Sequence, residues 1–281
     1  MSKFDNMYLD LCKKIMDNGV IGHNRTGTDT KKITHEVMQF NLEEEFPILT
    51  CKSVAFKSAA LEMLWFYQAQ SNDVRWLQDR GVKIWNEWQI DENGYYNGKY
   101  FGKEYAYTIG TAYGWIVKKY GLTQNLIEMI KNNPDDRRMI MSLWQNEYLP
   151  TAALPSCVWN TQWDVTEGKL NCIVTQRSCD VALGLPFNIS QYALLVNLIA
   201  KCTDLKPGKM TWIINNAHIY VDQFDGINKQ LERKNECLEA PKLWINPDIK
   251  DFFKFDNSKE LKDIKLIDYK NLGKISMPVS V

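Results

Sequence analysis

Two segments of the chain carry a cysteine and an arginine that could act together. Cys157 follows residues 154–156 and opens an alternating apolar segment, and Arg177 lies further along within residues 176–180. An arginine beside a thiol lowers the pKa of the thiol and stabilises the thiolate, which is the reactive form. If the segments flanking residues 167–168 pair as a hairpin, Cys157 and Arg177 lie at the same end. One interpretation is therefore a nucleophilic cysteine, and the other is a buried structural cysteine.

Four more polar residues stand where a purely structural role is not the obvious explanation. Glu62 lies in the apolar run 59–65, where a carboxylate is costly unless it is paired, hydrated or functional. The alternative is a glutamate that points outward from a helix surface. Residues 188–191 resemble a capping box, so Asn188 is predicted to be a helix N-cap, with one side of its amide left for a ligand. His218 and Tyr220, at i and i+2 of an expected strand, point the same way.

Composition argues against several other classes of protein. The seven cysteines include no C-x-x-C pair and the three histidines are widely spaced, which favours a reducing, cytoplasmic compartment and neither a disulfide framework nor a metal site. Lys plus Arg and Asp plus Glu both total 34, so no basic surface suggests nucleic-acid binding. The N-terminal residues lack the apolar region of a secretory signal, and no apolar run approaches the roughly 20 residues of a membrane helix.

Hydrophobic periodicity predicts the elements that must position these side chains. Apolar residues at helical spacing predict three helices, over 4–18, 57–70 and 189–203. A fourth helix is expected to have Thr123 as its N-cap and to end before Pro134. Alternating or continuous apolar residues predict the strands, over 38–42, 139–144, 157–165, 170–174 and 210–217.

These elements favour an α+β fold, with one large mixed β-sheet and helices on one face. The chain contains no repeat and no linker-like stretch, so residues 1–281 are expected to form a single domain. A sheet covered by helices on one side needs a cover on the other, which favours a homodimer packed sheet to sheet.

Taken in order, the motifs of the chain resemble those of the thymidylate synthase family. Residues 154–157 read Leu-Pro-Ser-Cys, residues 176–181 read Gln-Arg-Ser-Cys-Asp-Val, and residues 184–189 read Gly-Leu-Pro-Phe-Asn-Ile. Residues 218–220 read His-Ile-Tyr, and further matching segments occur at 25–28, 62–66, 84–88, 113–114 and 136–138. The resemblance spans nearly the whole chain. It implies a methyltransferase that converts dUMP to dTMP, with 5,10-methylenetetrahydrofolate as the co-substrate and without a metal.

The resemblance also implies a role for each matching residue. Cys157 would add to C6 of the uracil ring, Glu62 and Tyr113 would mediate proton transfers, and Asn188 would pair with N3–H and O4 of the base. Catalysis would further involve Arg177 and Asp180. Phosphate and ribose contacts would come from Arg25, Arg137, Arg138, Arg177, Ser178, His218 and Tyr220. The folate contacts would come from Lys52, Trp85, Trp88, Asp180 and Val281. In the family the double arginine reaches into the partner's site, so the resemblance implies an obligate homodimer.

The chain departs from the family pattern at two places. Val158 follows the nucleophile where histidine is common, and residues 215–216 are Asn-Asn where the family usually has Gly-Asp. These changes leave two alternatives: a hydroxymethylase acting on dUMP, or less readily on dCMP, and a nucleotide-binding regulator without activity. Retention of Cys157 and Glu62 argues against the regulator. Asn188 argues against dCMP, because cytosine presents a donor at C4 and needs an acceptor such as Asp.

Overall fold

A computed structural model describes residues 2–280 of the chain. Its main sheet has the strand order β1-β2-β9-β7-β6-β5, with β8 paired to β9, and two small two-stranded sheets lie apart from it. The strands of the main sheet are β1 (Val20–Gly22), β2 (Thr30–Asn41), β5 (Ile140–Ser142), β6 (Val158–Thr166), β7 (Lys169–Gln176), β8 (Cys179–Asp180) and β9 (Lys206–Tyr220). The small sheets contain β3 (Tyr95–Tyr96), β4 (Lys99–Tyr100), β10 (Lys242–Ile245) and β11 (Ile264–Ile267). The helices are α1 (Lys3–Asn18), α2 (Phe56–Tyr67), α3 (Arg75–Gln78), α4 (Gly114–Tyr120), α5 (Leu122–Asn132), α6 (Gly184–Cys202) and α7 (Phe224–Glu232).

The sheet is mixed, as the sequence predicts. β9 pairs antiparallel with β2 and parallel with β7, so its register aligns Met210 with Phe40 on one side and Trp212 with Val174 on the other. β6 and β7 form the predicted hairpin, in which Thr166 is paired with Lys169. The two connecting residues, Glu167 and Gly168, both have positive φ, at 51° and 69°, which is the geometry that joins twisted antiparallel strands through two residues.

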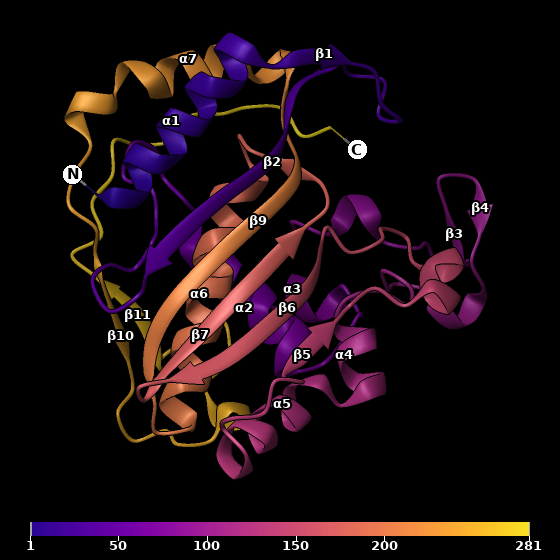
Figure 1. The fold of residues 1–281 in the computed structure, drawn as a ribbon. Coiled ribbons are helices and arrows are strands. Elements are labelled where there is room, and N and C mark those ends of the chain that lie inside the picture. Colours follow the sequence, from indigo (N-terminus) through magenta and orange to yellow (C-terminus); the bar gives the residue numbers. More distant parts are fainter. Residues whose placement is uncertain (1, 281) are drawn as a thin grey trace.

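Helices cover one face of this sheet, where α2 and α6 lie behind it in Figure 1 and α1 packs near β2. Aromatic contacts join the layers: Phe4 of α1 meets Phe40 at a centroid distance of 5.4 Å, and Tyr192 of α6 meets Trp212 at 5.5 Å. On the opposite face Val37 is 62% exposed and Ile173 38% exposed, and in Figure 1 no helix of residues 2–280 lies in front of β2 or β7 on that side. Among the helices described, none combines the length and the apolar character needed to cross a membrane.

Three predicted boundaries were wrong. The helix predicted over 189–203 begins at Gly184, directly after a turn in which Asp180 accepts from the backbone N–H groups of Ala182 and Leu183. The helix predicted over 57–70 ends at Tyr67. Thr123 lies inside α5 instead of capping it, since its hydroxyl donates to the Tyr67 carbonyl over 2.9 Å.

β9 also extends beyond the predicted 210–217, from Lys206, which pairs with Lys169, to Tyr220, past the Gln176 end of the hairpin. The strand continues to Tyr220, so His218 and Tyr220 are held in a paired register opposite Lys32 and Thr30 of β2. The two rings lie with centroids 5.2 Å apart.

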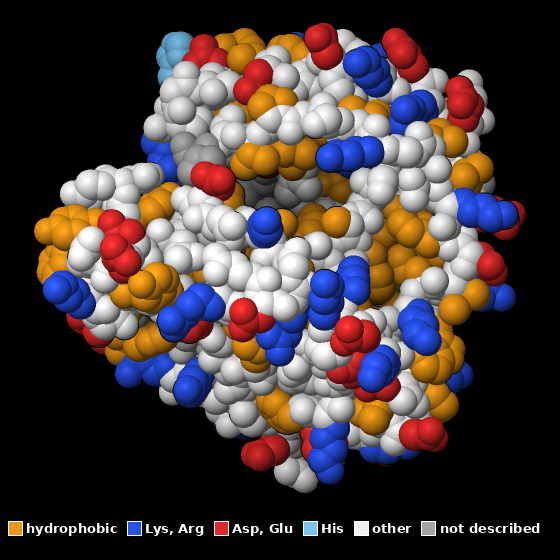
Figure 2. Space-filling view, turned by 180° about the vertical axis from the view of Figure 1, so that it is seen from behind, with side chains coloured by type: hydrophobic (Ala, Val, Ile, Leu, Met, Phe, Trp, Pro, Cys, Tyr) orange, Lys and Arg blue, Asp and Glu red, His pale blue; other side chains and the backbone are white. Residues whose placement is uncertain are grey.

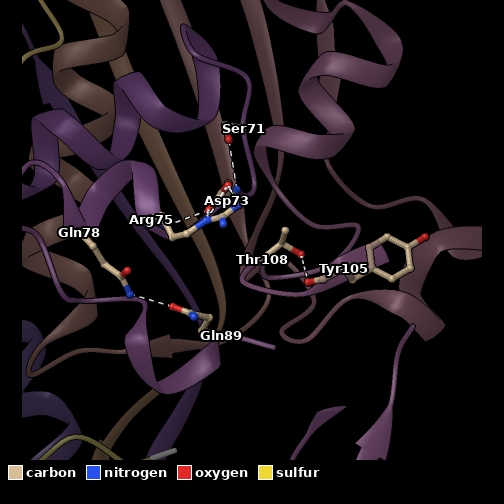
Figure 3. Close-up of polar contacts among 7 residues, drawn as sticks. All are labelled: Ser71, Asp73, Arg75, Gln78, Gln89, Tyr105 and Thr108. Atoms are coloured by element: carbon tan, nitrogen blue, oxygen red, sulfur yellow. Dashed lines mark hydrogen bonds and ion pairs between the residues drawn. The ribbon is translucent and has the colours of Figure 1, made fainter. Parts of the chain in front are cut away.

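Polar contacts hold the segment between α2 and α4 in place (Figure 3). Arg75 forms an ion pair with Asp73 over 2.6 Å, and the amide of Gln78 in α3 donates to Gln89 over 2.8 Å. The second contact spans the loop that carries Trp85 and Trp88, two of the predicted folate-side residues. This segment therefore delivers both indoles to the helix side of the sheet at defined positions.

Candidate active site

A cavity of about 860 Å³ lies where the ends of β6, β7 and β9 meet α2 and α6. The loop before β2 and the tail residues Val279 and Ser280 complete its border. The space-filling view shows the surface hollowed on this side of the molecule, with hydrophobic side chains around the hollow (Figure 2). The lining contains most of the predicted site residues, namely Arg25, Glu62, Trp85, Trp88, Tyr113, Cys157, Arg177, Ser178, Asp180, Asn188, His218 and Tyr220.

The β6–β7 hairpin brings Cys157 and Arg177 together. The backbone N–H of Arg177 donates to the Cys157 carbonyl over 2.9 Å, and the guanidinium Nη2 lies 4.0 Å from the Cys157 Sγ. The guanidinium is fixed by donating to the carbonyls of Pro155, over 2.7 Å, and of Ser156, over 3.0 Å. Its position beside the thiol is therefore set by backbone atoms of the two residues that precede Cys157.

The charge state of Cys157 differs from the simple expectation. Burial raises the pKa of the Cys157 thiol, and the positive charges of Arg177 and Arg25 offset part of that rise. Arg177 acts in the predicted direction, but desolvation outweighs it, so the thiol holds its proton at neutral pH in this state. Cys157 is nonetheless half-buried, whereas the other six cysteines are buried.

Tyr113 contacts Cys157 through its hydroxyl, which accepts from the backbone N–H of that residue over 3.0 Å. Its ring stacks on Phe66 with centroids 4.4 Å apart. Tyr113 has a φ of 45°, which a bulky residue adopts only when its surroundings enforce it. The next residue, Gly114, lies so close to the Ser71 carbonyl that a Cβ there would approach its oxygen to 2.0 Å, so the turn requires glycine.

Glu62 is buried, with 6% of its surface exposed, which excludes the outward-pointing alternative. Trp85 donates its indole N–H to Oε1, and Gln191 donates its amide to Oε2 over 2.5 Å. Burial raises the pKa of Glu62 to about 7, although both hydrogen bonds favour the charged form. This carboxyl group can therefore exchange a proton near neutral pH.

Asn188 lies within α6, so its predicted role as an N-cap is wrong. Its Oδ1 accepts from Gln176 over 3.3 Å, and its Nδ2 donates to Gln191 over 3.4 Å. The side chain is half-buried and lines the cavity. The amide thus has defined neighbours on the protein side and remains able to bind a ligand.

Asp180 and His218 lie on paired strands, β8 and β9. Burial raises the pKa of Asp180 and lowers that of His218, and the opposite charges oppose both shifts. Asp180 Oδ2 accepts from Gln223 over 3.2 Å, and His218 Nδ1 lies 3.0 Å from Asn216 Oδ1. Asn216 therefore keeps a hydrogen bond to the histidine at a position where the family usually has a charged residue.

The predicted anion-binding residues fall into two groups. Arg25, Arg177 and Ser178 line the cavity together. Arg137 and Arg138 lie outside its described lining. Arg138 is paired with Asp136 over 2.8 Å, and its side chain is 83% exposed.

The predicted folate-side residues are also divided. Trp85 and Trp88 line the cavity, whereas Lys52 is only 5% exposed and donates to the Ala182 carbonyl. The expected contact between Lys52 and the folate does not fit this burial, which also lowers the pKa of Lys52. Val281 lies outside the described residues.

Sequence reasoning did not identify Gln176, Gln191 and Gln223 as site residues. Gln176 and Gln191 are each 2% exposed and Gln223 is fully buried, and all three donate to other site residues. Gln191 lies in the same kind of apolar run as Glu62, so the cost of burying a polar group would have identified it as well.

Comparisons with known proteins agree with this geometry. The family model described as thymidylate synthase matches residues 6–281. The chain is 53% identical to the thymidylate synthase of Clostridium beijerinckii over the full length of both chains, and 40% identical to that of Bacillus licheniformis over the full length of both. Its structure is similar to that of the thermostable thymidylate synthase A of Bacillus subtilis, with a TM-score of 0.87, 38% identity and 99% of each chain covered. The chain belongs to the thymidylate synthase family.

Proposed function

We propose that the chain methylates dUMP to dTMP through a covalent bond between Cys157 and C6 of the uracil ring. The family to which it belongs is one of methyltransferases that use methylenetetrahydrofolate as co-substrate. The observation that supports this assignment best is the cavity in which a half-buried thiol, a titratable buried carboxyl and a base-reading amide meet. The contacts of Cys157 with Arg177 and Tyr113 give the thiol a defined direction toward that cavity.

Covalent addition overcomes the low reactivity of C5 in the uracil ring. C5 of uracil is a poor nucleophile, and addition of a thiolate at C6 moves electrons into an enolate that makes C5 reactive. Sγ of Cys157 forms the new bond to C6, and Arg177 stabilises the thiolate that attacks. Because burial keeps the free thiol protonated, the reaction must also remove that proton.

Glu62 and Tyr113 are suited to the proton transfers. The pKa of Glu62 is about 7, which is close to the value at which a side chain acts efficiently as both acid and base near neutral pH. After C5 has bonded to the one-carbon unit, removal of the C5 proton restores an enolate that expels the folate amine, and Cys157 leaves by elimination once hydride has reached the exocyclic methylene carbon. Tyr113, whose hydroxyl lies beside the nucleophile's backbone, would assist that removal.

The nucleotide would be held at three points. Asn188 would accept from N3–H and donate to O4 of the base. His218 and Tyr220, adjacent on β9, would bind the ribose hydroxyl. Arg25, Arg177 and Ser178 would bind the phosphate, for which the planar arginine side chain provides paired donors.

The described cavity has features that fit a folate. The indole N–H of Trp88 is buried without a hydrogen-bond partner among residues 2–280, and Trp88 lines the cavity. Trp85 supports Glu62 and also lines the cavity, and Asp180 would accept from the pterin. When bound, methylenetetrahydrofolate supplies the one-carbon unit and the hydride. Val279 and Ser280 border the cavity, so the tail, with Val281 at its end, would exclude water from the site.

The active form would be a homodimer, and residues 1–281 would make one catalytic domain of it. The uncovered sheet face with Val37 and Ile173 offers an apolar surface for a second copy. Arg137 and Arg138 lie outside the cavity of their own chain, so we expect them to contact the phosphate in the partner's site. The cysteine pattern supports a cytoplasmic location.

The experiment that tests the function is identification of the products from dUMP and methylenetetrahydrofolate. We expect dTMP, measured by chromatography, and dihydrofolate, measured by near-ultraviolet absorbance, in equal amounts, and neither from Cys157→Ala. Formation of 5-hydroxymethyl-dUMP without dihydrofolate would instead identify a hydroxymethylase. Binding of dUMP without any turnover would identify a regulator.

A further inference from the structure

Five side chains form a continuous chain of hydrogen bonds beside the cavity, which we call the amide relay: Trp212, Gln176, Asn188, Gln191 and Glu62. Trp212 Nε1 donates to Gln176 Oε1 over 2.9 Å, and Gln176 Nε2 donates to Asn188 Oδ1 over 3.3 Å. Asn188 Nδ2 donates to Gln191 Oε1 over 3.4 Å, and Gln191 Nε2 donates to Glu62 Oε2 over 2.5 Å. Every bond in the relay therefore runs in the same direction, from the indole to the carboxylate.

Both ends of the amide relay fix that direction. The indole N–H of Trp212 can only donate, so Gln176 must turn its oxygen toward it. At the other end, Gln191 Nε2 faces the Glu62 carboxylate and also the Ala59 carbonyl, at 3.4 Å. Reversing either glutamine would bring like atoms together, and because each is 2% exposed, water could not replace the lost bonds.

Asn188 lies between these two fixed amides, so its own direction is fixed as well. A reversed Asn188 would place its Oδ1 against Gln191 Oε1 and its Nδ2 against Gln176 Nε2. In the observed direction, Oδ1 keeps a second acceptor site and Nδ2 keeps a second proton for the cavity that Asn188 lines. Uracil matches this pair with N3–H and O4. Cytosine presents an acceptor at N3 and an amino group at C4, and would need the reverse.

We propose that Gln191 is a positioning residue that locks the Asn188 amide in the direction that reads uracil and connects it to Glu62. This inference rests on the proposed function, in which Asn188 contacts the base. It adds that base selection depends on Gln191, a second side chain of α6, which contacts the Asn188 amide. It also places base recognition and the proton-transferring carboxyl on one hydrogen-bonded unit.

The test removes the amide while keeping the shape of the side chain. Gln191→Met has a similar length and no hydrogen-bonding group. The matched control is Gln230→Met, because Gln230 is fully buried, accepts from Tyr8 over 3.1 Å and donates to the Gly226 carbonyl over 3.2 Å, and lies outside the described lining of the cavity. Dissociation constants for dUMP and dCMP are measured by calorimetry on the full-length chain, which needs no turnover.

We expect Gln191→Met to reduce the preference for dUMP over dCMP by about tenfold or more, which is the scale for losing a buried hydrogen-bond partner. Gln230→Met should retain the wild-type preference. A Gln191→Met protein with a preference within about twofold of the wild type would overturn the relay while leaving the proposed function intact. A wild-type chain that does not distinguish dUMP from dCMP would refute the base-reading role of Asn188 itself.

A second variant keeps the polarity of the site in case Gln191→Met does not fold. Gln191→Glu still accepts from Asn188 but places a second carboxyl against Glu62, so the pair would share a proton and lose it at higher pH. The other titratable groups that interact with Glu62 are Tyr113 and Tyr192, and burial raises the pKa of both phenols well above its usual value, so they stay neutral. We expect the acid limb of kcat/KM to move up by about one pH unit or more. An unmoved limb would overturn the connection to Glu62.

Discussion

The burial of Glu62 predicts a specific pH dependence of stability. Its pKa in the folded chain is about 7, against an ordinary value of 4.5, and desolvation is the principal cause of the rise. Between these values the folded state holds a proton that the unfolded state has released. Stability contributed by this group is therefore present at low pH and is lost as the pH rises toward 7.

The magnitude follows from the size of the shift. Each pKa unit corresponds to about 1.4 kcal/mol, so the rise from 4.5 to about 7 makes the ionised group cost about 3 kcal/mol. Over the practical range from pH 5 to pH 8, most of this amount, about 2.5 kcal/mol, should be lost. Replacing Glu62 by glutamine removes the titration and with it this slope.

The assay compares the urea unfolding of wild type and Glu62→Gln at pH 5 and pH 8, at one protein concentration. Glutamine turns an amide toward Gln191 and so adds a cost, but that cost does not vary with pH and cancels in the comparison. Titration of Asp180 and His218 is common to both proteins and cancels as well. We expect the variant to gain about 2.5 kcal/mol relative to wild type between the two pH values. If the unfolding free energies of the two proteins change by the same amount between pH 5 and pH 8, Glu62 is not a buried, protonatable group.

Three further predictions concern turnover. Cys157→Ser should lower kcat by roughly 10⁴-fold or more while dUMP still binds, and labelling with 5-fluoro-dUMP and folate should map to Cys157; a near-normal rate would contradict covalent catalysis. Asn188→Asp should shift the substrate preference from dUMP toward dCMP, by a factor that corresponds to the roughly 1–3 kcal/mol cost of a mismatched buried group. Competition assays measure this shift. An unchanged preference would indicate that Asn188 has only a structural role. Deletion of Val281 should impair dihydrofolate formation more than dUMP binding, and equal losses in both would argue against the tail as a lid.

The sequence predicted the frame of the site well, because periodicity reflects burial directly. Strand alternation across residues 167–168 indicated the hairpin, and the hairpin alone placed Cys157 near Arg177. The apolar run around Glu62 likewise indicated a buried carboxyl. In each case a local pattern was sufficient, because the residues concerned are close in the sequence or are brought together by a single turn.

Two features of the site did not follow from these local patterns. Asn188 has the sequence of an N-cap, yet α6 begins at Gly184, directly after a turn in which Asp180 accepts from the backbone N–H groups of Ala182 and Leu183. Lys52 has the type of residue that binds an anion, yet the chain folds its side chain inward to the Ala182 carbonyl. The Asp180 contacts are local, whereas the Lys52 contact joins segments far apart in the sequence, which no spacing rule reveals.

Val158 stands directly after Cys157, where the family commonly has histidine. Val158 is 3% exposed and lines the cavity, so β6 offers no polar group at this position. A buried carboxylate still needs hydrogen-bond donors on both oxygens, because an unpaired buried charge strongly destabilises the folded state. Here Trp85 supplies one donor and Gln191, from α6, supplies the other. Because Gln191 also contacts Asn188, we expect activity with valine after Cys157 to depend on this glutamine. Val158 and Gln191 should therefore be tested together, and Gln191→Met should damage turnover less in a chain that carries Val158→His than in one that keeps the valine.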